Sequence, residues 1–238
     1  TYKSKRFSTF TSDLRFCARW LVENNCKDVC MESTGKYWIP IYNILEPSCN
    51  IVLAHPKYVK SIRGKKTDKK DAKWIADIFK HDLISGSFMP PADIRQLRDL
   101  MRYHFKLTNF TTGEKNRMQN CLTMSNLKLD DVFSDVFGKA LTNIINHLLS
   151  NPSEKLTDVS NFRTKGMKAT DEQVLSAVDG CICPEQAEKM RIIRSHMDNL
   201  ELCKLNLESL ILSVSEKYHA QLNLVLRCRV SKPFPLSP

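Results

Sequence analysis

The sequence predicts an α/β domain with parallel strands, followed by a helical region. Up to residue 90, short apolar runs alternate with helix-like stripes, as in a sheet whose strands are joined by helices. A Pro90-Pro91 pair then marks a boundary. Beyond it, residues 92–125 contain one glycine and no proline, and residues 185–226 contain neither, so both runs predict long helices.

The elements of the first part follow from their periodicity. Residues 28–31 and 50–54 are predicted as buried strands, and residues 2–7 as an edge strand. Apolar residues at helical spacing predict helices over 13–24, 37–45 and 67–84.

The second part is expected to be helical throughout. Leu97, Leu100, Met101 and Phe105 give the first long helix its apolar period, and shorter helices are predicted over 133–149 and 170–178. The apolar seam of residues 185–226 is typical of a coiled coil. The predicted segments are an α/β domain (1–90), a helical segment (91–150), a loop-rich connector (151–183), a long arm (184–226) and a tail (227–238).

Charge and cysteine content narrow the function classes. Lys and Arg outnumber Asp and Glu by 36 to 26 among 238 residues, which favours a polyanionic partner, chiefly nucleic acid. The apolar runs are too short to span a bilayer, so we expect no membrane partner. The chain does not open with a signal peptide, so the nine cysteines are interpreted as reduced thiols of a cytoplasmic protein, without a zinc site.

Three carboxylates form the candidate chemical centre. Glu32 ends the first buried strand, and Asp68 and Asp71 lie one turn apart on one face of the helix that follows Thr67. Carboxylates this close together favour a bound cation, so with Glu32 they predict a Mg²⁺ (or Mn²⁺) site for phosphodiester cleavage. Each also has an ordinary alternative, as a helix-dipole partner or a solvated strand end.

Basic residues crowd the stretch around the aspartates, as a site that handles a phosphate backbone would need. They are Lys57, Lys60, Arg63, Lys65, Lys66, Lys69, Lys70 and Lys73. A second basic series recurs every three to four residues on the long helix, at Arg95, Arg98, Arg102 and Lys106, with Lys115 and Arg117 one repeat further on. From spacing alone, this series is equally a phosphate-binding stripe or a solubilising face. The predicted nucleic-acid-binding residues are the second series together with Lys65, Lys66 and Lys69.

Order, spacing and flanking residues together resemble a known family. The motifs are Glu32-Ser33-Thr34-Gly35-x-Tyr37-Trp38, a strand leading to His55-Pro56, and Lys66-Thr67-Asp68-Lys69-x-Asp71-Ala72-x-x-Ile75-Ala76. They are similar to the N-terminal domain of insertion-sequence family one-hundred-and-ten, which also contains the Piv-type DNA invertases. Leu97-Arg98-x-Leu100-x-Arg102-Tyr103 and Lys115-Asn116-Arg117 are similar to the helical segment of that family. The resemblance extends over roughly residues 2–226.

The resemblance implies an RNase H-like (RuvC-like) fold with a D-E-D-D carboxylate set. Glu32 matches the second member, and Asp68 and Asp71 match the third and fourth. The implied activity is that of a DNA transposase, which moves an insertion sequence by recombination while a structured RNA guides recognition of the DNA. The family also uses a serine nucleophile in a separate C-terminal domain and assembles as multimers, partly through the helical arm. The expected partners are therefore DNA, a structured guide RNA and further copies of the chain, at the nucleoid in a prokaryotic cytoplasm.

Two departures from the family pattern lead us to expect a truncated chain that lacks its first strand. The earliest aspartate, Asp13, begins a predicted helix, so the first carboxylate of the set is expected before Thr1. After Leu226 the Pro-Gly-Ile turn of the family is missing, although codon degeneracy permits it one frame over. A frameshift near Leu226 or Arg227 is the hypothesis, and an ordinary divergent tail is the alternative. No serine of the chain is assigned as the nucleophile.

Three hypotheses for the function stay open. The first is an incomplete, inactive transposase, and the second is a non-enzymatic nucleic-acid-binding or dimerising remnant. The third is a self-sufficient RuvC-like nuclease, which needs a fourth carboxylate that the sequence does not reveal. Metal-dependent cleavage by the purified chain would distinguish the first from the second.

Overall fold

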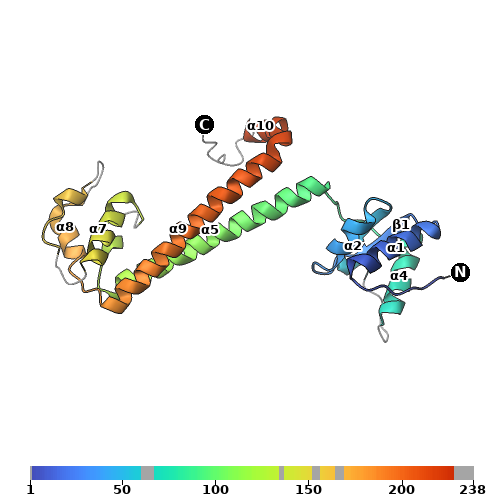
Figure 1. Ribbon diagram of the computed structural model, residues 1–238, viewed down its shortest axis with the longest axis horizontal. Coiled ribbons are helices and arrows are strands. Elements are labelled where there is room, and N and C mark those ends of the chain that lie inside the picture. Colours follow the sequence, from blue (N-terminus) through green and yellow to red (C-terminus); the bar gives the residue numbers. More distant parts are fainter. Residues whose placement is uncertain (1, 60–66, 134–136, 152–155, 164–168, 228–238) are drawn as a thin grey trace. The chain divides into compact units, whose positions relative to one another are not determined.

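The protein consists of two compact units, Thr1–Pro91 and Ala92–Pro238 (Figure 1). The structure, a computed structural model, describes residues 2–59, 67–133, 137–151, 156–163 and 169–227. It is mostly helical, with one small parallel sheet. None of the helices within these ranges combines the length and the apolar character needed to cross a membrane.

The first unit contains a two-stranded parallel sheet. Its register runs from Asp28 opposite Asn50 to Glu32 opposite Ala54. Both predicted strands are therefore confirmed, as the parallel pair that alternating strands and helices predict. The described elements of this unit are α1 (Thr11–Glu23), β1 (Asp28–Glu32), α2 (Trp38–Leu45), β2 (Asn50–Ala54), α3 (Pro56–Val59) and α4 (Asp68–Lys80).

A small apolar core joins the sheet to α4. Buried Ala54, Val59 and Ile78 form it together with Ile84, which follows α4. The chain then returns along β2, where Gly86 makes an antiparallel bridge to Ala54 and the Ser87 amide donates to the Leu53 carbonyl over 2.8 Å. This return borders β2 on the side away from β1 and was not predicted from the sequence.

The predicted edge strand over residues 2–7 is wrong, because the described residues there form no strand. Side chains hold this segment instead: the Tyr2 hydroxyl donates to Asp77, and Lys3 donates to Asn24 over 2.6 Å. The Phe7 ring packs against Trp20, with 5.8 Å between ring centroids. The aromatic and basic side chains of this segment therefore make its contacts without strand pairing.

The second unit is built on two long antiparallel helices that run side by side, coloured green and orange in Figure 1. Leu107 on one helix packs against Leu200, Leu207 and Ile211 on the other. The run predicted as a single helix to residue 226 is divided after Ser215. The described elements of this unit are α5 (Ala92–Met124), α6 (Leu129–Val132), α7 (Lys139–Ser150), η1 (Ser160–Phe162), α8 (Asp171–Ala177), α9 (Pro184–Ser215), η2 (Glu216–Tyr218) and α10 (His219–Arg227).

The larger core lies where α5 ends and α9 begins, among α6, α7 and α8. Its most buried side chains include Leu129, Leu141, Ile144 and Met190. Thr170 caps α8 in a capping box with Gln173.

Polar contacts at three positions of α5 connect it to the returning chain. Lys217 and Tyr218 both donate to the Asp93 carboxylate, the tyrosine over 2.6 Å. His104 Nε2 lies 2.7 Å from a carboxylate oxygen of Glu208. His196 Nδ1 lies 2.9 Å from Glu114 Oε1, and the Glu114 side chain is only 10% exposed. A shift of one helix along the other would break the contacts at all three positions, so they fix the register of α5 against α9.

Candidate functional site

Glu32 lies at the C-terminal end of β1, the sheet edge at which open α/β folds bind ligands. The Ser33 amide donates to the Ala54 carbonyl over 2.9 Å and so extends the strand pairing by one residue. Gly35 then turns the chain with a φ of +55°, a conformation that favours glycine. The exposed Glu32 carboxylate accepts a hydrogen bond from the Thr34 hydroxyl.

Asp68 and Asp71 lie in the first turn of α4. Thr67 starts this helix, because its side chain accepts from the Lys70 amide over 3.4 Å and its carbonyl accepts from the Asp71 amide over 2.9 Å. The Asp68 side chain is 98% exposed and lies 3.6 Å from Arg6 Nη2. An exposed pair of this kind adds little stability, so Asp68 is free to take another partner.

The carboxylates have suitable chemistry for Mg²⁺ but are not arranged as a metal site. Among the described residues, no three His, Cys, Asp or Glu side chains lie close enough together to hold a metal ion. Helix α4 packs on β1, yet Glu32 is engaged by Thr34 and Asp68 faces Arg6 in solvent. The grouping of Glu32, Asp68 and Asp71 therefore stays a prediction.

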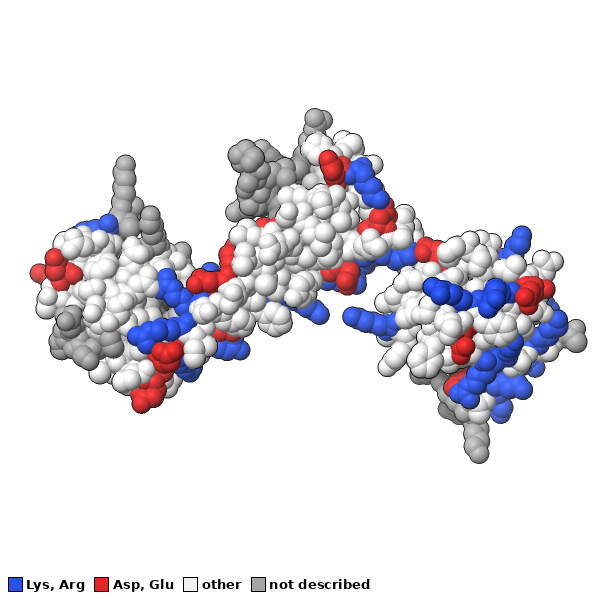
Figure 2. Space-filling view, viewed as in Figure 1, with Lys and Arg blue, Asp and Glu red and all other residues white. Residues whose placement is uncertain are grey.

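The basic residues around the aspartates are described only in part. Lys69 is exposed on α4, and the Lys73 ammonium lies 4.3 Å from the centroid of the Tyr2 ring. Lys65 and Lys66 lie outside the described residues, as do Lys60 and Arg63. Figure 2 shows many Lys and Arg side chains on the visible face of this first unit.

The second basic series does not form one continuous stripe. At about 100° per residue, Arg98, Arg102 and Lys106 share one face of α5, and Lys115 lies on the opposite side. The Lys115 ammonium instead lies 4.9 Å from the centroid of the Phe137 ring. Arg117 returns to the first face, where its Nη1 donates to Glu114 over 2.7 Å.

We call Arg98, Arg102 and Lys106 the α5 stripe. All three are exposed, and none has an ion pair or hydrogen-bond partner for its side chain within the described part of the chain. Arg95, predicted with them, is half-buried. The stripe presents three cations to solvent along one helix face, an arrangement suited to a row of phosphates.

Exposed aromatic side chains flank the α5 stripe, a feature that was not predicted from the sequence. Tyr103 and Phe110 lie on one side of it and Phe105 on the other. Phe105 was predicted to belong to the apolar face of this first long helix, but it is 65% exposed. Its position out of step with Leu97, Leu100 and Leu107 was the available signal. Aromatic rings beside cations are typical of surfaces that bind nucleic acid through both phosphates and bases.

Comparison with known families supports the resemblance. The IS110 family model of DEDD transposases, described as "Transposase", matches residues 1–126, more than half of the chain. A comparison with curated proteins gave no match. The matched region contains Glu32, Asp68, Asp71 and the α5 stripe, and the family suggests a divalent metal. The chain belongs to the IS110 family of DEDD transposases.

Proposed function

We propose that the chain acts in the DNA recombination that moves an insertion sequence, with the α5 stripe as a surface that binds the nucleic-acid backbone. The observation that carries the proposal is the set of cations Arg98, Arg102 and Lys106 inside the family-matched region, which have no partner among the described residues. Asp99 lies on the same helix face and lowers the net positive charge of this surface by one, but it forms no described ion pair with the three cations. The proposed setting is the nucleoid of a prokaryotic cytoplasm, with structured RNA and further copies of the chain as additional partners.

The proposal is tested by the salt dependence of duplex binding. Each Lys or Arg that neutralises a phosphate adds about 0.9 to the slope of log affinity against log salt. The triple variant Arg98→Gln/Arg102→Gln/Lys106→Gln should lower that slope by about 2 to 3 and weaken binding over all sequences. Fluorescence anisotropy of a labelled duplex at several salt concentrations measures both quantities.

A charge-matched control uses three exposed lysines elsewhere in the chain. They are Lys80, Lys128 and Lys189. Changing all three to Gln removes the same net charge, so it separates a specific surface from general attraction. Equal slopes for the two triple variants would refute the stripe as the binding surface.

We further propose that Glu32, Asp68 and Asp71 contribute to a divalent-metal site in an RNase H-like domain. The carboxylate chemistry, the packing of α4 on β1 and the family membership support this assignment. Asp68→Asn and Asp71→Asn together remove two of the three proposed carboxylate ligands. The thermal stabilisation that Mg²⁺ or Mn²⁺ gives the wild type should disappear in this variant.

Asp130 and Asp131 on α6 provide the control, as an exposed pair of aspartates on another helix. Changing both to Asn should leave the metal-induced shift of the melting temperature unchanged. If the Asp68/Asp71 variant responds to metal as the wild type does, the assignment fails.

A second candidate function is nucleic-acid binding without cleavage. The separate positions of the carboxylates favour it. Incubation of the purified chain with DNA over a range of Mg²⁺ and Mn²⁺ concentrations distinguishes the two candidates. Cleavage that Asp71→Asn abolishes would support the enzyme, whereas binding without cleavage at every concentration would support the alternative.

A further inference from the structure

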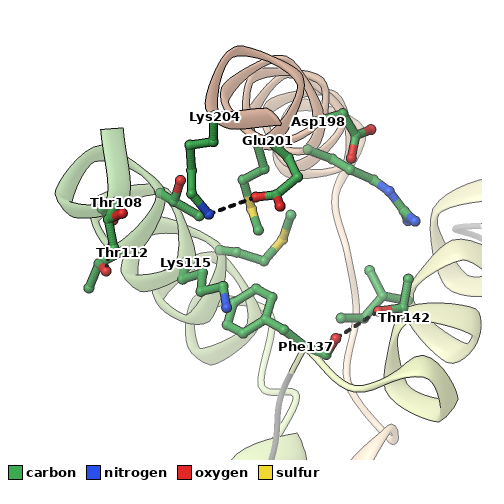
Figure 3. A pocket seen from close by; sticks show the side chains of 13 residues that line it. Thr108, Thr112, Lys115, Phe137, Thr142, Asp198, Glu201 and Lys204 are labelled. Atoms are coloured by element: carbon green, nitrogen blue, oxygen red, sulfur yellow. Dashed lines mark hydrogen bonds and ion pairs between the residues drawn. The ribbon is translucent and has the colours of Figure 1, made fainter. Parts of the chain in front are cut away.

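A cavity of about 410 Å³ opens between α5, the start of α7 and α9 (Figure 3). Its walls come from one face of each long helix, with Thr108, Thr112 and Lys115 on α5 and Arg194 and Asp198 on α9. Its size falls within the range of small-ligand sites, which begins at about 300 Å³. The cavity lies on the side of α5 opposite the α5 stripe, so the two surfaces are distinct.

The threonines of the α5 wall present hydrogen-bond acceptors. Thr108 donates its hydroxyl proton to the His104 carbonyl, Thr111 to the Leu107 carbonyl and Thr112 to the Thr108 carbonyl, each over 3.1 Å. A hydroxyl whose proton is used in this way still has lone pairs to offer. These oxygens therefore suit a ligand with N–H or O–H groups along one edge.

The charged groups of the cavity are unevenly paired. Lys204 donates to Glu201 over 3.0 Å, which the dashed line in Figure 3 marks, so these two charges neutralise each other. Arg194 and Asp198 have no partner among the residues that the structure describes. The described contact of the Lys115 ammonium is the Phe137 ring. Lys115 and Arg194 carry two positive charges and Asp198 carries one negative charge. The cavity therefore has a net positive charge, which suits an anionic group.

Apolar surface completes the lining. Phe137 lies close to Lys115 in Figure 3, and Met118, Ile145 and Met197 also border the cavity. A small inorganic anion would leave this apolar surface and the threonine row unused. A purely apolar ligand would leave Arg194 and Asp198 desolvated without partners. The lining suits a ligand that joins a flat, polar-edged ring to an anion.

We propose that this cavity binds one nucleoside monophosphate unit. Arg194 and Lys115 bind its phosphate, the threonine oxygens accept from the edge of the base, and the apolar side chains cover the face of the base. The unit is either a free mononucleotide or an unpaired residue of a nucleic-acid strand. The site does not depend on the α5 stripe, so each can fail without the other.

Isothermal titration calorimetry of the full chain tests the proposal, with AMP, CMP, adenosine and inorganic phosphate as probes. A monophosphate should bind with a Kd below roughly 1 mM, and adenosine and phosphate should each bind at least about tenfold more weakly, because each lacks one half of the contacts. No binding of either monophosphate, or equal affinity for inorganic phosphate, would overturn the proposal.

Single substitutions locate the site. Arg194→Gln and Lys115→Gln should each weaken monophosphate binding about tenfold, the loss expected for one charge-assisted hydrogen bond. Lys189→Gln removes an exposed charge from the same helix as Arg194 but outside the cavity, and should change the Kd less than about twofold. An equal effect of Arg194→Gln and Lys189→Gln would mean that the nucleotide binds elsewhere.

A competition experiment distinguishes the two sources of the nucleotide. If the unit belongs to a strand, Arg194→Gln should weaken binding of a labelled single-stranded oligonucleotide, and AMP should compete with it. If the cavity takes the free nucleotide, Arg194→Gln should weaken AMP binding and leave the oligonucleotide unaffected. An Arg194→Gln variant with wild-type affinity for both ligands would refute either form. If the triple α5 stripe variant loses duplex binding, the proposal of nucleotide binding in the cavity is not affected.

Discussion

Replacing Gly180 with alanine tests the close packing of the chain against the end of α5. A Cβ added at this position would lie 2.2 Å from the Ser125 carbonyl oxygen and 2.9 Å from that of Asn126. Both atoms belong to the backbone and cannot rotate away. The Cys181 amide also donates to the Ser125 carbonyl over 3.0 Å, which holds the two segments together. The backbone must therefore move by about 1 Å to reach ordinary van der Waals separation.

The expected loss of stability lies at the upper end of the range for overpacking. Inserted methyl groups cost about 1 to 3 kcal/mol where side chains can adjust, so a clash with backbone atoms justifies about 3 kcal/mol. For a chain of this size, 1 kcal/mol corresponds to a shift of about 2 to 4 °C in Tm. Gly180→Ala should therefore lower the Tm by about 6 to 12 °C, measured by circular dichroism.

Gly113→Ala is the matched control, because it adds the same methyl group within α5. Its Cβ would lie 3.5 Å from Arg117 Nη1, an ordinary contact. Alanine is favoured over glycine in a helix interior by about 1 kcal/mol, so the Tm should rise by about 2 to 4 °C. A Gly180→Ala protein that unfolds within 1 °C of the wild type would refute the reasoning, and so would two variants that shift in the same direction.

Three further predictions concern hydrogen bonds and thiols. His196→Ala should lower the free energy of unfolding in urea by about 1 to 3 kcal/mol, because it leaves the nearly buried Glu114 with Arg117 alone; an equal loss for the exposed His219→Ala would contradict this. The hydrogen bond from Lys217 holds the pKa of Asp93 well below its usual range, so its stabilising contribution is complete at neutral pH and fades as the pH falls below about 4. The ratio of the η2 hydrogen-exchange rate in the wild type to that in Asp93→Asn should therefore rise below that pH. A ratio that does not change with pH would refute this prediction. Burial raises the pKa of the Cys17 and Cys30 thiols, so mass spectrometry after brief alkylation should find them less modified than the exposed Cys203.

The sequence predicted elements well where one physical signal dominated. Residues 28–32 and 50–54 are short apolar runs between polar residues, and they form the parallel pair. The absence of glycine and proline predicted α9 but not its end at Ser215, because the Ser-Glu-Lys sequence there carries no strong stop signal. The strand predicted over residues 2–7 was wrong, because side chains rather than strand pairing make the contacts of this segment.

The candidate site was predicted less completely, for geometric reasons. The identity and order of Glu32, Asp68 and Asp71 led to the family, but a linear pattern cannot place a strand end against a helix start. Lys115 was grouped with Lys106 by proximity in the chain, although nine residues of helix place them on opposite sides. The cavity that Lys115 lines combines three separate segments, so no local pattern could indicate it.

The polar contacts at three positions of α5 restrict how the length of the arm can change. Asp93 and Glu114 are as far apart along the chain as Lys217 and His196, so the two sides have equal length between these contacts. A single-residue insertion between Asp93 and Glu114 would rotate one end of α5 by about 100° relative to the other. The contacts of Asp93, His104 and Glu114 could then not all be kept. Insertions and deletions are therefore tolerated only as compensating pairs, one in each helix and close to a whole number of turns. Relatives with longer or shorter arms should differ by equal blocks of about seven or eleven residues in both helices, since these lengths make about two and three turns.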